Sequence, residues 1–217
     1  MNKREISERV TKSYFTQDYN KLVRWMSFWY QIDSILKIKN IEGKKILEIG
    51  VGNKFVSNYL KDLGLNIKTC DMNKNLKPDF VADIKKMPFK DNQFDVVVCF
   101  EVLEHMPFKE ALEGLKEMRR VTSEYVIFSV PYSGFCISAY IKPFATDGGK
   151  IIRIPFPIYR PKILVKKLGI GHYWTVGELG TSKYRVRKKI KELGYIIIKE
   201  EIPVMNSHHQ FWTLRKI

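Results

Sequence analysis

The sequence predicts a single α/β domain, doubly wound around a mainly parallel sheet of seven strands. From residue 45 onwards, short strand-like segments alternate with helical segments, an order that places helices on both faces of a parallel sheet. Two segments, FDVVVCF (94–100) and YVIFSVP (125–131), are almost continuously apolar, as strands are when both faces of a sheet are covered. The length of 217 residues suits one sizeable core.

Each element can be placed in turn. Residues 14–37 carry apolar side chains at helical spacing, which predicts an N-terminal helical segment. The expected strands are 45–50, 66–71, 79–83, 94–100, 125–131, 195–202 and 208–217, and the expected helices are 56–63, 108–120 and 182–193. The last two strands lie close enough in the chain to pair as a hairpin, so the last strand is expected to be antiparallel.

One domain, 1–217, is therefore expected, in four parts. These are an N-terminal helical cap (1–40), a core (41–131), an insertion without clear period (132–180), and a C-terminal helix with a strand hairpin (181–217).

The amino-acid composition limits the kinds of binding partner and the cellular location that we expect for this protein. The net charge of +15 favours an anionic partner, although it also fits a merely basic proteome. Cys70, Cys99 and Cys136 are widely spaced, which predicts neither a disulfide framework nor a zinc site. The N-terminal residues lack the apolar run of a signal peptide, and no apolar run approaches the length of a membrane span. We therefore expect a cytoplasmic protein.

Residues at two strand ends mark a candidate ligand site. The first strand runs into ILEIGVGNKF, where Gly50 and Gly52 allow a tight turn and close approach of a ligand to the backbone. Asp71 ends the second strand, where a carboxylate can accept hydrogen bonds from both hydroxyls of a ribose. An aspartate that caps a turn would give the same pattern. A dinucleotide fold would need glycine where Phe55 stands.

The most specific pattern is VADIKKMPFKDNQFDVVVCFEVLEHM (81–106). It combines an acidic–apolar pair, a Pro-Phe turn, a Phe-Asp pair before the fourth strand and a Glu-x-x-Glu-His loop. Together with Glu48, two residues before the first glycine, it makes residues 43–131 resemble the class I S-adenosylmethionine-dependent methyltransferases, particularly the type 11 group. The chain departs from that family at Lys54, where a third glycine is common.

The resemblance implies S-adenosylmethionine as the cofactor and gives each matching residue a role. Glu48, Gly50 and Gly52 would line the methionine part of the cofactor. Asp71 would hold the ribose, and Met72 would pack on the adenine. The pair after the third strand would contact the adenine amine and ring, and the end of the fourth strand would line the methyl-transfer face. In chain order, the implied cofactor-binding residues are Glu48, Gly50, Gly52, Asp71, Met72, Asp83, Ile84 and Phe100.

The Glu-x-x-Glu-His loop offers two catalytic interpretations. Methyl transfer needs a base only when the acceptor begins protonated with a high pKa, and His105 is the candidate base beside Glu101 on the methyl-transfer face. A surface histidine would look the same. Alternatively, Glu101, Glu104 and His105 would hold a divalent metal ion, as in some relatives, with His172 as a further ligand. Many type 11 members carry these residues without a metal, so we assign none.

The insertion at 132–180 lies where this family places its substrate lid. It holds seven Lys and Arg residues against Asp147 and Glu178, with interleaved aromatic residues, which suits an anionic substrate with a flat or apolar part. An irregular subdomain with a small core of its own is the alternative. The expected substrate-binding residues are Tyr132, His172 and Tyr173.

The basic stretch SKYRVRKKIK (182–191) is by default a solvated helix face, with contact to nucleic acid or an anionic membrane as the alternative.

The leading function is methyl transfer to an oxygen or nitrogen of a small anionic metabolite. The alternatives are methylation of RNA or of a quinone or lipid precursor, and a non-catalytic adenosyl-binding module.

Overall fold

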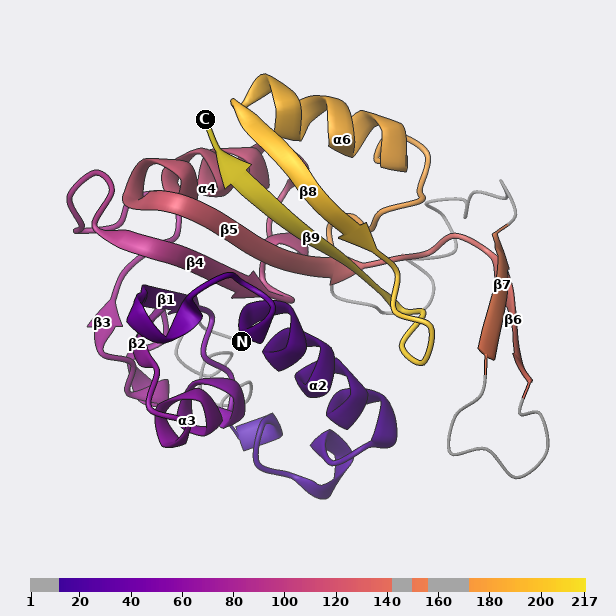
Figure 1. Cartoon of the computed structure of the whole chain (residues 1–217), viewed down its shortest axis with the longest axis horizontal. Helices are drawn as coiled ribbons and strands as arrows, with labels where there is room; N and C mark the ends of the chain where they lie inside the picture. The colour runs from indigo at the N-terminus through magenta and orange to yellow at the C-terminus, as the bar shows by residue number, and fades with distance from the viewer. Residues whose placement is uncertain (1–11, 142–149, 156–171) are drawn as a thin grey trace, which may run out of the picture.

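The computed structural model describes residues 12–141, 150–155 and 172–217. Its central sheet has seven strands in the order β3-β2-β1-β4-β5-β9-β8. All neighbours from β3 to β5 pair in parallel, whereas β9 pairs antiparallel with both β5 and β8 (Figure 1). The strand bounds are Lys45–Ile49 (β1), Asn66–Asp71 (β2), Phe80–Val81 (β3), Phe94–Phe100 (β4), Thr122–Pro131 (β5), Tyr195–Glu201 (β8) and His209–Lys216 (β9).

The predicted α/β fold with a mainly parallel seven-stranded sheet and an antiparallel last strand is confirmed. The bounds of β2 and β4 coincide with the predicted 66–71 and 94–100. β5 begins at Thr122, three residues before the predicted start, because Thr122 pairs with Phe94 as soon as the preceding helix ends.

Helices cover both faces of the sheet. α2 (Leu22–Leu36) and α3 (Phe55–Asp62) lie on one face, and α4 (Phe108–Val121) and α6 (Lys183–Glu192) lie on the other (Figure 1). Each face has its own apolar core. Phe28, Ile35, Val56 and Leu60 pack on the first face, and the second includes Leu115, Met118, Val186 and Ile190. The sheet side chains between these layers alternate in direction, so a strand buried on both faces is apolar throughout.

The N-terminal cap is helical over a shorter range than predicted. The periodicity at 14–37 predicts one segment, but the long helix begins at Leu22, and a short 3₁₀ turn, Gln17–Tyr19, precedes it. Trp25 and Phe28 pack their rings against Phe55 at the start of α3. The cap is therefore held to the core beside the turn that follows β1.

The insertion contains regular structure that the sequence did not predict. β6 (Cys136–Ile141) and β7 (Lys150–Pro155) pair as an antiparallel hairpin in a sheet of their own. Apolar residues stand at successive positions of these strands, so the alternation of apolar and polar residues that indicates a half-buried strand is not visible in the sequence. Where the chain is described again, Trp174 and Val176 are buried in the core, and the Trp174 indole donates to the Leu103 carbonyl oxygen at 3.0 Å.

The segments 142–149 and 156–171 of the predicted lid lie outside the described residues. Across the described ranges, no helix combines the length and the apolar character needed to cross a membrane.

Candidate active site

The turn after β1 is shaped by two glycines and a lysine with positive φ. Gly50 has a φ of +83°, and a Cβ on it would lie 2.2 Å from Val102 Cγ2, so no side chain fits there. Gly52 has a φ of +49°. Lys54, where the family commonly has a third glycine, adopts the left-handed conformation with a φ of +63°. The backbone course that a glycine would favour is thus present, which removes the reason to regard the turn as degenerate.

Asp71 lies beside this turn. Its Oδ2 accepts a hydrogen bond from Val51 N at 3.0 Å, and its Oδ1 accepts one from Asn73 N at 2.8 Å. Burial raises the pKa of Asp71, although these backbone hydrogen bonds lower it in part. Each oxygen keeps a second lone pair for a ligand donor. The Asp71 carboxylate therefore links the turn after β1 to the end of β2. The next residue, Met72, is 77% exposed.

Glu48 is an acid buried without full compensation. Its Oε2 has no hydrogen-bond partner among the described residues. Burial raises the pKa of Glu48 to about 8, against a smaller opposing effect of a hydrogen bond with Ser57 on α3. Such a group is costly unless a ligand donor satisfies it. The structure thus brings Glu48, Gly50, Gly52 and Asp71 together at the carboxyl ends of β1 and β2.

The other predicted cofactor-binding residues lie around this turn in different environments. Asp83 is exposed and its Oδ1 accepts a hydrogen bond from Lys85 N at 2.9 Å, as a turn carboxylate does. Ile84 is buried on the α4 face of the sheet, and Phe100 is buried on the α2 face with its ring 6.0 Å from that of Phe211. The segment before Asp83 is tied to β2 through the hydrogen bond from Ala82 N to the Asp71 carbonyl oxygen.

Glu101 follows β4 in a left-handed conformation with a φ of +55°. It accepts hydrogen bonds from Ser129 Oγ at 2.5 Å and from His209 Nε2 at 2.8 Å. Burial would raise the pKa of Glu101, but the charge and hydrogen bond of His209, with the Ser129 hydroxyl, hold the pKa below its ordinary value. Glu101 is therefore a carboxylate fixed by two hydrogen bonds at the end of β4, where the sequence analysis expects the methyl-transfer face.

A second cluster lies next to Glu101. Its residues come from the 3₁₀ turn Leu103–His105 and from the segment that begins at residue 172. One ligand atom from each of Glu104, His105 and His172 lies within 4.8 Å of the others. Glu104 Oε2 and His172 Nδ1 are buried and have no hydrogen-bond partner among the described residues. Burial and the Glu101 charge raise the pKa of Glu104 well above its ordinary value, whereas burial and His105 lower the pKa of His172. Both shifts favour the uncharged form of the side chain.

Of the predicted substrate-binding residues, His172 belongs to this cluster and Tyr173 is tied to it. The half-buried Tyr132 follows β5, and its N donates to the His208 carbonyl oxygen at 2.7 Å. Tyr173 is 66% exposed, and its N donates to the Glu104 carbonyl oxygen at 2.8 Å. The segment that begins at residue 172 is thus fastened directly to the turn that carries the predicted base.

Several site residues were missed by the sequence analysis. Tyr14 and Tyr19 lie over Gly52, because a Cβ on this glycine would lie 3.8 Å from Tyr14 Cε1 and 3.7 Å from Tyr19 Oη. The Arg24 guanidinium stacks 4.5 Å from the Tyr19 ring centre. Burial, with the nearby Tyr19 and Asp71, raises the pKa of Tyr14 to about 12. These residues carry no motif; His209, by contrast, was predictable, because an antiparallel strand beside β5 begins where β5 ends.

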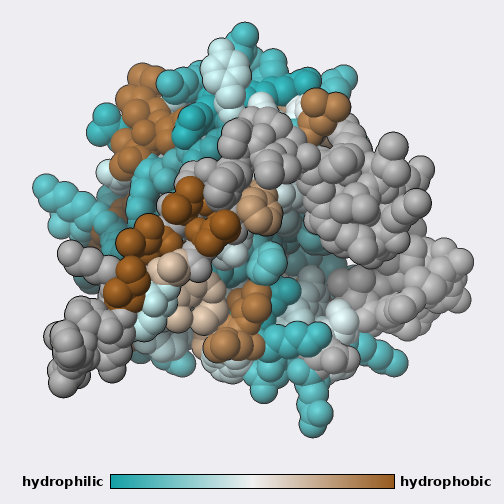
Figure 2. All heavy atoms as spheres, turned by 90° about the vertical axis from the view of Figure 1, so that its right-hand side faces the viewer, coloured by the Kyte–Doolittle hydropathy of each residue, from teal (hydrophilic) through white to brown (hydrophobic). Residues whose placement is uncertain are grey.

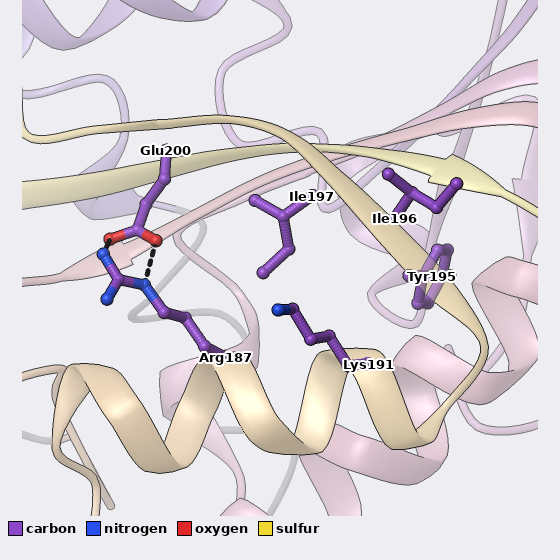
Figure 3. A pocket seen from close by; sticks show the side chains of 6 residues that line it. All are labelled: Arg187, Lys191, Tyr195, Ile196, Ile197 and Glu200. Carbon is purple, nitrogen blue, oxygen red and sulfur yellow. Dashed lines mark hydrogen bonds and ion pairs between the residues drawn. The ribbon is translucent and has the colours of Figure 1, made fainter.

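A large surface hollow lies away from these residues. It has a volume of about 530 Å³ and is lined by Arg187, Lys191, Tyr195, Ile196, Ile197 and Glu200, between α6 and β8 (Figure 3). Glu200 pairs there with Arg187 at 2.5 Å and also with Lys183, while Lys189 pairs with Glu192. Three of the six cations of the basic helix are thus paired with two glutamates, as is common on a solvated face.

Comparison with known proteins places the chain in a family. Residues 47–129 match the model of a type 11 methyltransferase domain. The chain belongs to the class I S-adenosylmethionine-dependent methyltransferases. It is 30% identical over 185 residues to an uncharacterized protein of Methanocaldococcus jannaschii, covering 68% of this chain and 77% of that protein. It is 31% identical over 125 residues to a demethylmenaquinone methyltransferase of Beutenbergia cavernae, covering 48% of this chain and about half (51%) of that enzyme.

Solved structures share the fold at low identity. The magnesium protoporphyrin IX methyltransferase of Synechocystis, with bound S-adenosylhomocysteine, superposes with a TM-score of 0.58 at 15% identity, covering 100% of this chain and 89% of that one. A 1,6-didemethyltoxoflavin-N1-methyltransferase of Burkholderia thailandensis superposes with a TM-score of 0.57 at 11% identity, covering 97% and 87%. The cofactor of this methyltransferase is S-adenosylmethionine, and the buried Glu48 Oε2, which has no hydrogen-bond partner among the described residues, fits its amine.

Proposed function

We propose that this methyltransferase transfers the methyl group of S-adenosylmethionine to a hydroxyl oxygen of a small anionic acceptor. The observation that carries the proposal is the grouping of two glutamates and three histidines, Glu101, Glu104, His105, His172 and His209, at the end of β4 and β5. An amine that is already neutral needs no such machinery, whereas a hydroxyl must lose a proton as it attacks.

The cofactor would lie across the carboxyl ends of β1 to β4, as ligands do in open parallel sheets. Asp71 would accept hydrogen bonds from the ribose, Glu48 would accept from the methionine amine, and Gly50 and Gly52 would let the backbone approach. Met72, Asp83 and Ile84 would contact the adenine, and Phe100 would line the sulfur end. The support is that Glu48 and Asp71 keep free acceptor capacity beside the glycine turn.

The histidines His105 and His172 would activate the acceptor hydroxyl by accepting its proton. In the transfer, the bond between sulfur and methyl breaks as the oxygen–methyl bond forms, and the hydroxyl proton passes to an imidazole. His105 is 56% exposed at its side chain and has its ring 5.1 Å from that of His172. We assign the base to this pair, because the lowered pKa of His172 keeps a neutral imidazole available at neutral pH. Alignment of the reacting atoms would supply much of the remaining acceleration.

The anionic character of the acceptor is supported by Arg24. Its charge makes a small lowering contribution to the pKa of Glu101 and opposes the larger rise in the pKa of Glu104, so the guanidinium lies within electrostatic reach of both carboxyl groups. The lid sequence adds a net charge of +5, from seven cations against two acids. RNA is the less supported acceptor, because half of the cations of α6 are paired with glutamates.

A divalent metal ion is a second candidate for activating the acceptor. Glu104, His105 and His172 fit such an ion, since two of their buried ligand atoms have no partner among the described residues. When bound, it would lower the pKa of the acceptor hydroxyl. Titration of the protein with Mn²⁺, followed by electron paramagnetic resonance, should show one site that His172→Ala weakens. Methyl transfer that is unchanged by EDTA, with no bound Mn²⁺, would reject the metal and leave the base.

The function is tested with a panel of paired acceptors. Phenols and carboxylate-bearing alcohols would each be offered beside the matching amine, with methyl-labelled S-adenosylmethionine as donor. The proposal predicts transfer to hydroxyl acceptors with an anionic group, and at least about a hundredfold lower rate for His105→Ala/His172→Ala, in line with the usual contribution of a general base. Preferential methylation of the amines, with no effect of the double substitution, would contradict it.

A further inference from the structure

The β6–β7 hairpin exposes four isoleucines on one face. Ile137 pairs with Ile154, and Ala139 pairs with Ile152, so these side chains lie on the same face as Ile141. Ile137, Ile141, Ile152 and Ile154 are 52%, 51%, 51% and 53% exposed. Figure 2 shows a band of apolar atoms on the side of the molecule that carries this hairpin in Figure 1.

Such a hairpin needs something to cover it. It forms a two-stranded sheet separate from the central one, and an isolated two-stranded hairpin is marginally stable in water. Exposed apolar patches of this kind mark sites that meet a protein or a membrane.

Charge favours a membrane over a second copy of the chain. Neither strand contains an acidic residue, whereas the sequence of β7 includes Lys150 and Arg153. The whole chain carries a net charge of +15, so two copies repel one another and an anionic surface attracts them. Isoleucine offers no flat ring on which a nucleic-acid base could stack.

The hairpin also adjoins the candidate active site. It follows β5 after a short connection in which Ser133 N donates to the Val176 carbonyl oxygen at 2.9 Å, next to Tyr132. In Figure 1 it projects beyond the ends of β5 and β9, where Glu101 and His209 meet. A surface that covers the hairpin would therefore face the acceptor side of the molecule.

We infer that the apolar face of the β6–β7 hairpin docks on an anionic lipid bilayer. Its isoleucines insert at the level of the headgroups, and the net positive charge of the chain attracts the anionic lipids. The inference concerns membrane binding alone and stands whether or not the acceptor proposed above is right.

The test uses the full chain and sedimentation with large unilamellar vesicles. Vesicles of phosphatidylglycerol and phosphatidylcholine are compared with vesicles of phosphatidylcholine alone. Ile137→Ser/Ile154→Ser removes two exposed side chains from the hairpin face, and Ile196→Ser/Ile198→Ser removes two from β8, where they are 38% and 51% exposed. Titration with S-adenosylhomocysteine checks that every variant is folded.

The chain should bind the anionic vesicles about tenfold or more tightly than the neutral ones. The hairpin variant should lose about tenfold or more of this affinity, as the removal of two inserted isoleucines implies, and the β8 variant should keep it. Equal loss in both variants, or no binding to anionic vesicles, would overturn the inference. So would a dimer in solution that the hairpin variant alone dissociates, because the face would then belong to a second copy.

Discussion

His209 Nε2 lies 2.8 Å from Glu101 Oε2, so the first residue of the last strand fixes the carboxylate that follows β4. The contact is possible because β9 runs antiparallel to β5 and begins at the end where the parallel strands finish. It places an imidazole from outside the recognised motifs on the buried Glu101, the first acid of the Glu-x-x-Glu-His loop.

Removal of this imidazole should impair catalysis more than cofactor binding. In His209→Ala, burial of Glu101 is offset less, because only the Ser129 hydroxyl and the Arg24 charge remain, so the pKa of that carboxyl rises and one of its two hydrogen bonds is lost. We expect kcat to fall about tenfold or more, in the range of a lost charge-assisted hydrogen bond, with S-adenosylhomocysteine affinity changed little. His208→Ala is the matched control, because its side chain is exposed. Equal effects of the two substitutions would argue against a role for His209.

Asp71→Ala should weaken cofactor binding. It removes the proposed ribose acceptor and also the hydrogen bonds from Val51 N and Asn73 N, so some loss of stability should accompany the loss of affinity. We expect S-adenosylhomocysteine to bind about tenfold to a hundredfold less tightly, the size of one or two lost hydrogen bonds to a charged group. Calorimetry measures the affinity, and thermal melting confirms the fold. Unchanged affinity in a folded variant would remove Asp71 from the ribose site.

Gly50→Ala should be destabilising through a clash as well as through backbone strain. Gly64 has the same φ of +83° but nothing within 4 Å of a Cβ, whereas a Cβ on Gly50 would lie 2.2 Å from Val102 Cγ2. Gly64→Ala should therefore cost about 1–2 kcal/mol, the strain of a left-handed alanine, and Gly50→Ala should cost about 1–3 kcal/mol more. Urea unfolding without cofactor measures both. Similar losses in the two variants would mean that Val102 moves aside freely.

Glu48 should make the stability of the cofactor-free protein depend on pH. Because burial raises its folded pKa to about 8, the folded chain keeps a proton that the unfolded chain has released above its ordinary pKa of 4.5. Stability should therefore fall as pH rises across this interval, by at most about 1.4 kcal/mol per pH unit from this group. Glu48→Gln should lack this contribution. Unfolding free energies at pH 5.5, 6.5 and 7.5 test it, and parallel curves for the two proteins would contradict it.

The sequence predicted the elements whose patterns are local. The strands β4 and β2 were predicted from FDVVVCF and NIKTCD, because a buried parallel strand and its flanking turns depend on residues that are adjacent in the sequence. Lys54 departed from the glycine pattern, yet the fold holds it at a φ of +63°, a conformation that composition alone does not reveal.

Long-range placement accounts for what was missed. Tyr14 and Tyr19 lie over Gly52, and Arg24 stacks on Tyr19, but nothing in their own segment indicates a contact with a turn more than thirty residues away. The β6–β7 hairpin was missed because apolar residues follow one another along its strands. His172 was expected as a further ligand beside His105, but its distance could not be predicted, because it depends on the hydrogen bond from Tyr173 N to the Glu104 carbonyl oxygen.

The most direct test of the proposed cofactor site is a crystal structure of the full chain with S-adenosylhomocysteine. The ribose hydroxyls should lie within hydrogen-bond distance of the Asp71 carboxylate, the amine should approach Glu48, and the sulfur should face Glu101. An adenosyl group bound elsewhere, or a crevice beside Gly50 and Gly52 that stays closed to the ligand, would contradict the account.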